Sequence, residues 1–232
     1  MSMQPKVLLM CGVIAGPLFV TTLLIEGATK AGYSPLRHPG SSLAWGEFGW
    51  VQVLNFIVAG LLSLALALGL RRMLQPFNGS AWGPVLIACW AIGLIGAGIF
   101  LTDPVNGFPP GTPNAMLHPS WHGALHDLLS VPGFLCLDIA CFVFSRWFAK
   151  RGRPGWALYS ALTGIVFGIA FALASAAFSQ VAVLIPVGGL LQRIAAVAGW
   201  SWLTLLAISF LRSPLNASRA GGALTNTQRA HR

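Results

Sequence analysis

Six apolar runs constrain this chain more than any other feature of its sequence. They cover about residues 7–25, 51–70, 84–101, 121–148, 156–178 and 190–211. Each run is close to the ~20 residues that a helix needs to cross the hydrocarbon core of a bilayer. Because lipid offers the backbone no hydrogen-bond partner, such runs must be helical. We therefore predict an all-α polytopic membrane protein, with a six-transmembrane-helix bundle in residues 1–211.

The composition agrees with this architecture. Only 8% of the 232 residues are charged and 56% are hydrophobic, whereas about 25% of a soluble domain is charged. The six runs leave no room for a separate soluble domain. Residues 212–232 are rich in Ser, Asn, Gly and Arg and show no hydrophobic periodicity. We predict that they form a disordered, basic, cytoplasmic tail.

The basic residues predict how the bundle is oriented. If the N-terminus is cytoplasmic, 11 of the 14 Lys and Arg residues flank the cytoplasmic side and only Lys30, Arg37 and Arg193 fall outside. The positive-inside rule then places both termini in the cytoplasm of a multi-pass plasma (inner) membrane protein. Because the net charge of +9 lies at helix ends and in the tail, we expect membrane lipids as partners and no nucleic acid.

Chemistry-bearing side chains gather between Asp103 and Asp138. These 36 residues hold three His and three Asp in an otherwise almost uncharged chain. His122 and His126 are four residues apart, so on a helix they differ by about 40° and share a face. Together with His118 and Asp103 they are candidate zinc ligands, and bound zinc would lower the pKa of a water to about 7. The alternative is that these polar residues face lipid headgroups or cap helix ends.

Two further acids are candidates for catalysis, and a third lies inside the membrane. Asp127 or Glu47 would be the general acid or base. Asp138 lies near the middle of the fourth apolar run, where an ionised carboxylate costs about 3 kcal/mol even on a lenient scale. It is either part of a proton relay or polar pocket, or a protonated group hydrogen-bonded to Asn55 or to a Ser or Thr of the last two helices.

Arg37 and His38 lie in the first long loop, on the predicted outer side. Since Arg gives paired hydrogen bonds to phosphate oxygens, this dipeptide is a candidate for binding a lipid headgroup. The alternative is that both are ordinary loop residues near the headgroups.

Several short motifs, in their order along the chain, carry a resemblance. They are Tyr33-Ser34-Pro35, Ser41-Ser42-Leu43 before Gly49-Trp50, Asp103-Pro104 and His122-Gly123-x-x-His126. From about Val7 to Leu211 the chain resembles the bacterial and archaeal integral membrane proteins called domain of unknown function 998. That resemblance implies a multi-helix membrane protein and no established activity. The chain is also similar in style to zinc-dependent membrane hydrolases, including alkaline ceramidases. It departs from them by having six predicted helices in place of seven and no His-x-x-x-His pair in the last helix.

Three functions therefore remain open. The first is a metal-dependent hydrolase that acts on a lipid-derived substrate at the outer membrane face. The second is a proton- or cation-linked transporter, or a small-molecule binding protein, that uses Asp138. The third is a structural membrane partner without chemistry. The first two require the His and Asp side chains to converge in one water-accessible recess.

Overall fold

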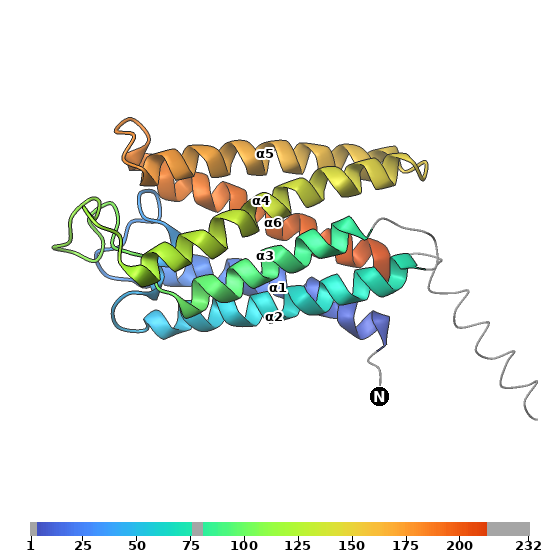
Figure 1. The fold of residues 1–232 in the computed structure, drawn as a ribbon, viewed down its shortest axis with the longest axis horizontal. Coiled ribbons are helices and arrows are strands. Elements are labelled where there is room, and N and C mark those ends of the chain that lie inside the picture. Colours follow the sequence, from blue (N-terminus) through green and yellow to red (C-terminus); the bar gives the residue numbers. More distant parts are fainter. Residues whose placement is uncertain (1–3, 76–80, 213–232) are drawn as a thin grey trace, which may run out of the picture.

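The computed structural model describes residues 4–75 and 81–212, and long helices dominate that part of the chain (Figure 1). Its six α-helices are α1 (Pro5–Thr29), α2 (Gly49–Leu74), α3 (Trp82–Ile99), α4 (Trp121–Ala149), α5 (Pro154–Phe178) and α6 (Gly188–Leu211), with short 3-10 helices η1 (Gly40–Ala44) and η3 (Ile185–Val187). All six are long and apolar enough to cross a membrane. The predicted all-α, six-helix fold is therefore confirmed. Beyond Arg212, the predicted tail lies outside the described residues.

The six helices form a closed ring. Each helix packs against the one before it and the one after it, and α6 closes the ring by packing against α1. Successive helices run antiparallel, so the start of α1 and the end of α6 lie at the same end of the bundle (Figure 1). A ring of six helices leaves space along its axis, which side chains must fill or a ligand must occupy.

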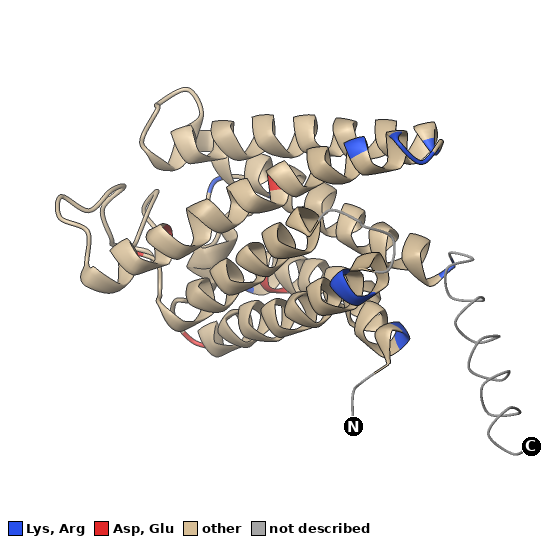
Figure 2. Ribbon diagram, turned by 45° about the vertical axis from the view of Figure 1, so that its right-hand side comes forward, with Lys and Arg blue, Asp and Glu red and all other residues tan. Residues whose placement is uncertain are grey.

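The two ends of the bundle differ in charge (Figure 2). One end, which we call the basic end, carries Lys and Arg residues at the start of α1 and at the end of α6. Further basic residues lie there around the α2–α3 and α4–α5 connections. The opposite end, which we call the loop end, is formed by residues 30–48, 100–120 and 179–187. This asymmetry is the pattern on which the predicted orientation rests; which end faces the cytoplasm stays a prediction.

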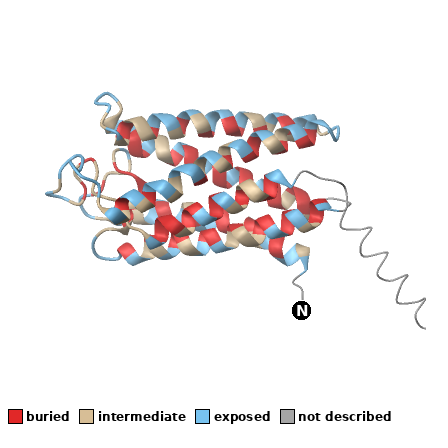
Figure 3. Ribbon diagram, in the orientation of Figure 1, coloured by how far each residue is buried: buried red, intermediate tan, exposed pale blue. Residues whose placement is uncertain are grey.

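Apolar side chains point both outward and inward. Leu, Ile and Val residues on the outer faces of the helices are exposed, as Figure 3 shows along the whole bundle. Such a surface suits contact with lipid tails. Inside the ring, the rings of Phe19 and Trp200 stack with centroids 4.9 Å apart, and Trp90 meets Trp200 edge-on at 5.7 Å. These aromatic side chains fill the middle of the ring.

Helices α3 and α4 approach each other closely near the loop end. A Cβ atom on Gly93 of α3 would lie 2.8 Å from the Leu129 carbonyl oxygen of α4 and 3.1 Å from the Gly133 Cα atom. Only glycine fits here without moving a backbone, as expected for small residues at helix interfaces in membranes. This contact brings the end of α3 against the first turns of α4, where the predicted site residues lie.

Candidate functional site

Asp103 and Ser120 build the start of α4. The Ser120 backbone N–H and hydroxyl donate hydrogen bonds to the two Asp103 carboxylate oxygens at 2.8 and 2.6 Å. The Ser120 hydroxyl oxygen in turn accepts from the Gly123 backbone N–H at 3.0 Å, which makes Ser120 the N-cap of α4. A Cβ atom on residue 123 would overlap the Asp103 carboxylate. Asp103 therefore places a negative charge at the positive end of the α4 dipole.

His122 and His126 share one face of α4, as predicted, and that face is turned toward the end of α3. His122 Nδ1 lies 3.0 Å from the Leu101 carbonyl oxygen, and His126 Nδ1 lies 2.8 Å from the Phe100 carbonyl oxygen. Because a carbonyl oxygen can only accept, each Nδ1 carries the proton and donates, which leaves Nε2 of a neutral ring as an acceptor. His126 thus pairs with the C-cap carbonyl of α3, which has no partner within the helix, and His122 pairs with a carbonyl of the loop that follows.

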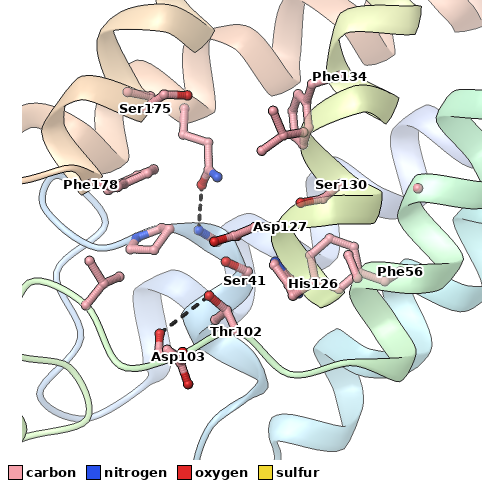
Figure 4. Close-up of a pocket in the computed structure, with 18 of the residues that line it drawn as sticks. Ser41, Phe56, Thr102, Asp103, His126, Asp127, Ser130, Phe134, Ser175 and Phe178 are labelled. Carbon is pink, nitrogen blue, oxygen red and sulfur yellow. Dashed lines mark hydrogen bonds between the residues drawn. The ribbon is translucent and has the colours of Figure 1, made fainter. Parts of the chain in front are cut away.

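A cavity of about 400 Å³ opens at the loop end, inside the ring of helices (Figure 4). Its apolar wall contains the side chains of Phe19, Phe56, Trp90, Phe134, Phe171 and Phe178. Its polar lining includes Ser41, Gln52, Thr102, Asp103, His126, Asp127, Ser130, Ser175, Ser179 and Gln192. An aromatic wall with a few polar groups is typical of a binding site for a small molecule.

Gln52 is one of two residues in this lining with a buried donor that no described residue pairs with; the other is Trp90, through Nε1. Gln52 is 0% exposed, and its side-chain oxygen accepts a hydrogen bond from the Asn55 amide at 3.1 Å. Its Nε2 group is also buried, and no described residue accepts a hydrogen bond from it. Buried polar groups almost always have a partner, and an unpaired one costs about 1–3 kcal/mol. A bound molecule with a hydrogen-bond acceptor would supply the missing partner.

The structure brings only some of the predicted site residues together. Asp103, His126 and Asp127 line the cavity, and Figure 4 shows Asp127 and His126 beside each other at its polar side. Glu47 and His118 are exposed loop residues that do not line it. Among the described residues, no group of three or more His, Cys, Asp or Glu side chains is arranged to hold a metal ion. The zinc site stays a prediction.

Asp138 lies apart from this cavity. Both of its carboxylate oxygens would lie 3.2 Å from a Cβ atom on Gly168, so the side chain faces α5. Its Oδ1 atom is buried and accepts no hydrogen bond from the described residues. The predicted pairing with Asn55 is wrong, because the Asn55 amide donates to the Phe19 carbonyl at 3.2 Å and to the Gln52 side chain.

Arg37 and His38 hold loops together. Arg37 donates to the Asn106 carbonyl at 3.0 Å and to the Asn114 side chain at 3.1 Å, which ties the first long loop to the loop before α4. His38 is 6% exposed, and its Nδ1 accepts from the Ser34 backbone N–H at 2.9 Å. Burial and the nearby guanidinium groups lower the pKa of His38 below its ordinary value. The expectation that His38 faces a lipid headgroup is corrected, because its ring is enclosed by protein.

A buried arginine on α6 completes this network, and the sequence reasoning did not single it out. Arg193 is 8% exposed and donates to the carbonyl of Pro35 at 2.7 Å and to the Tyr33 hydroxyl at 2.7 Å. The Tyr33 hydroxyl also contacts the carbonyls of His38 and Pro39, each at 3.0 Å. Burial raises the pKa of Tyr33, although the charge of Arg193 opposes that shift. An Arg near the start of the last apolar run was the available signal.

Gln52 and Gln192 were also missed. Each is a polar residue in the first turns of an otherwise apolar helix, and that was the signal. Gln192 accepts a hydrogen bond from the Gly40 backbone N–H at 2.7 Å. It therefore joins α6 to η1 at the edge of the cavity.

Comparison with known proteins gives a family and no activity. Residues 13–209 match the family model described as a protein of unknown function (DUF998). No curated protein and no solved structure matches the chain. The match spans all six helices, apart from the first turns of α1 and the last residues of α6. The resemblance noted in the sequence is confirmed: this chain belongs to the DUF998 family of proteins of unknown function.

Proposed function

We propose that this protein binds an amphiphilic small molecule or lipid in the cavity at the loop end. The observation that carries the proposal is the unpartnered, fully buried Nε2 group of Gln52 in the lining of that cavity. Exposed polar groups find water, whereas a buried donor needs a defined partner. A ligand acceptor atom within reach of Gln52 would offset the energetic cost of leaving this donor unpaired.

The shape of the lining supports an amphiphile over a fully polar ligand. Six aromatic side chains line the cavity together with polar groups from η1, α2, the loop before α4, α4, α5 and α6. Phe134 and Phe171 stack in parallel with centroids 4.6 Å apart, which presents a continuous apolar surface. Burying an apolar chain against such a surface contributes about 25 cal/mol per Å² of area removed from water. The polar side would hold the headgroup.

Ser175 allows the proposal to be tested by filling the cavity. Its side chain lines the cavity from α5, so the ring introduced by Ser175→Phe would occupy space that the ligand needs. Ser201 on α6 is exposed on the outer face, so Ser201→Phe adds the same ring outside the cavity. Both variants are purified with the wild type in a nonionic detergent, and thermal unfolding is followed against the concentration of decanol, decylamine, decanoate and decylphosphocholine.

The expected result is saturable stabilisation of the wild type and of Ser201→Phe by at least one of these amphiphiles. A ligand at 100 times its Kd adds about 2.7 kcal/mol of stability. Ser175→Phe should unfold at a similar temperature without ligand and lose most of the ligand-dependent shift. If no amphiphile gives a saturable shift, or if Ser175→Phe responds like the wild type, the cavity is not a binding site.

Metal-dependent hydrolysis remains the second candidate. The observation in its favour is that His126 lines the cavity with Nδ1 committed to the Phe100 carbonyl, so that Nε2 is the free acceptor. This is the arrangement of many metal-binding and general-base histidines. Zinc content measured on the purified protein, compared between the wild type and His126→Gln, tests it. Fewer than about 0.2 zinc ions per chain after growth with added zinc would refute it.

A cation- or proton-linked function at Asp138 is supported by one observation. An unpartnered carboxylate oxygen lies in the middle of a membrane-spanning helix, where acids are rarely retained without a role. Uptake by proteoliposomes with and without a proton gradient, compared for the wild type and Asp138→Asn, tests this function. Equal uptake by the two proteins would contradict it.

A further inference from the structure

We propose that the ligand of this cavity carries a cationic headgroup, an ammonium, which is held beside the Asp127 carboxylate. This inference rests on the proposed function, because it assigns a chemical class to the ligand of the same cavity.

The charged groups in the lining are acidic. Asp103 and Asp127 line the cavity, and none of the described residues in its lining is Lys or Arg. An anionic headgroup, such as a carboxylate, would therefore enter a site with two like charges and no fixed counter-charge. A cation would instead meet complementary charge, and charge complementarity is a main source of selectivity between ligands of equal size.

The two carboxylates differ in what they already contact. Both oxygens of Asp103 accept hydrogen bonds from Ser120 at the start of α4. Asp127 follows six residues after Trp121, the first residue of α4, and accepts no hydrogen bond from the described residues. Figure 4 shows its carboxylate beside His126 at the polar side of the cavity. Asp127 is therefore the carboxylate that is available to a ligand.

No basic side chain at the loop end neutralises Asp127. Arg193 is occupied by Tyr33 and by backbone carbonyls, and Arg37 by the Asn106 carbonyl and the Asn114 side chain. Lys30 donates to the Leu43 carbonyl. These are all the Lys and Arg residues at this end of the bundle. The charge of Asp127 is thus left for a cation that the protein does not itself provide.

The aromatic wall suits the same class of ligand. Ring faces carry negative potential and attract ammonium groups, and this attraction strengthens where water is excluded. Trp90 and Phe134 contact each other edge-on at 5.0 Å in the lining, and Phe134 continues the stack to Phe171. An alkyl chain bound along these rings would leave its head near Asp127, because Phe134 lies seven residues after Asp127 on α4 and so on a similar face.

Four amphiphiles with a ten-carbon chain separate the effect of the headgroup on binding from the effect of the chain. Decylamine is a cation at pH 7, decanol is neutral, decanoate is an anion and decylphosphocholine carries the quaternary ammonium together with a phosphate. Each is added at equal mole fraction to the protein in lipid nanodiscs, and apparent Kd values are taken from thermal unfolding. Decylamine and decylphosphocholine represent the two sources of an ammonium: a free lipophilic amine and a lipid headgroup.

The matched variants are Asp127→Asn, which removes the charge at nearly constant shape, and Glu47→Gln, which removes an exposed acid at the same end but outside the cavity. We expect decylamine to bind the wild type about tenfold more tightly than decanol. Asp127→Asn should reduce this preference to less than about twofold, whereas Glu47→Gln should keep it. Tighter binding of decylphosphocholine than of decylamine would assign the ammonium to a lipid headgroup, and the reverse would assign it to a free amine.

Two outcomes would overturn the inference and leave the proposed function intact. One is that decanoate binds as tightly as decylamine. The other is that Asp127→Asn keeps the wild-type preference for decylamine over decanol. In both cases Ser175→Phe must still block binding. By contrast, if none of the four amphiphiles binds, or if Ser175→Phe does not block binding, the proposed function itself fails. The unfolding temperature of each variant without ligand shows whether it folds.

Discussion

Replacing Asp103 by Asn separates a structural role from a metal-binding role. The carboxylate accepts two hydrogen bonds from Ser120, its backbone N–H at 2.8 Å and its hydroxyl at 2.6 Å. An asparagine can accept only one of them, and its NH₂ group then faces the other donor. A hydrogen bond to a charged group contributes about 1.5–3 kcal/mol, and a charge at a helix N-terminus about 0.3–1 kcal/mol. Because Asp103 is half-buried, we expect Asp103→Asn to lower the unfolding free energy by about 2 kcal/mol.

The measurement is equilibrium unfolding in mixed micelles, followed by circular dichroism, for Asp103→Asn, Ser120→Ala and the double variant. Since both side chains act in one network, the double-mutant cycle should give a coupling free energy of about 1 kcal/mol. Glu47→Gln, at an exposed acid of the same end, should stay within about 0.5 kcal/mol of the wild type. An Asp103→Asn protein as stable as the wild type, or two strictly additive single variants, would refute the capping role. A metal-ligand role predicts instead that Asp103→Asn loses stability only relative to the metal-loaded wild type, together with loss of bound metal.

Two further perturbations test the loop end. His38 accepts from the Ser34 N–H while neutral and its pKa is lowered by burial, so it stabilises the fold above its ordinary pKa of 6.5 and this contribution is lost as the pH falls below that value. The unfolding free energy of the wild type, measured from pH 8 to 5, should therefore decline by up to about 1.4 kcal/mol per pH unit below 6.5. The decline should be less steep in His38→Asn, whereas the exposed His118→Asn should show the wild-type slope. Equal slopes in all three proteins would refute this. A Gly93→Val side chain would meet the Leu129 carbonyl of α4 and should lower the unfolding free energy by about 1–3 kcal/mol, so a variant as stable as the wild type would contradict the close α3–α4 contact.

The sequence predicted the helices well because the membrane leaves few alternatives. An apolar run of about 20 residues has only one way to satisfy its backbone in lipid, so every predicted span is a helix. Its ends were harder to predict: α1 begins at Pro5 and continues to Thr29, beyond the predicted residues 7–25. A helix that is apolar on all sides also gives no sign of which face meets which neighbour. The ring order of the helices therefore could not be predicted.

The candidate site was predicted in part, for a similar reason. The spacing of His122 and His126 correctly placed both rings on one face of α4, yet spacing does not say what that face meets. In the structure it meets the carbonyl of Phe100, the C-cap of α3, and the carbonyl of Leu101 in the loop that follows. Asp127 lies about 100° further around the helix and so faces the cavity. Gln52 was overlooked because an amide at the start of an apolar run resembles a tolerated polar interruption.

The first turns of α4 thus serve two purposes on two faces, and experiments on this family must separate them. His126 belongs to both faces, since its Nδ1 holds the end of α3 while its ring lines the cavity. A His126 variant could lose binding because the ligand loses its contact with the imidazole, or because α4 moves away from α3. An unchanged unfolding free energy would indicate the lost contact. Asp127 and Ser175 face the cavity without joining α3 to α4, so their variants report on the ligand directly. Function should therefore be assigned from Asp127 and Ser175 first, and the histidines interpreted against the stability that they provide.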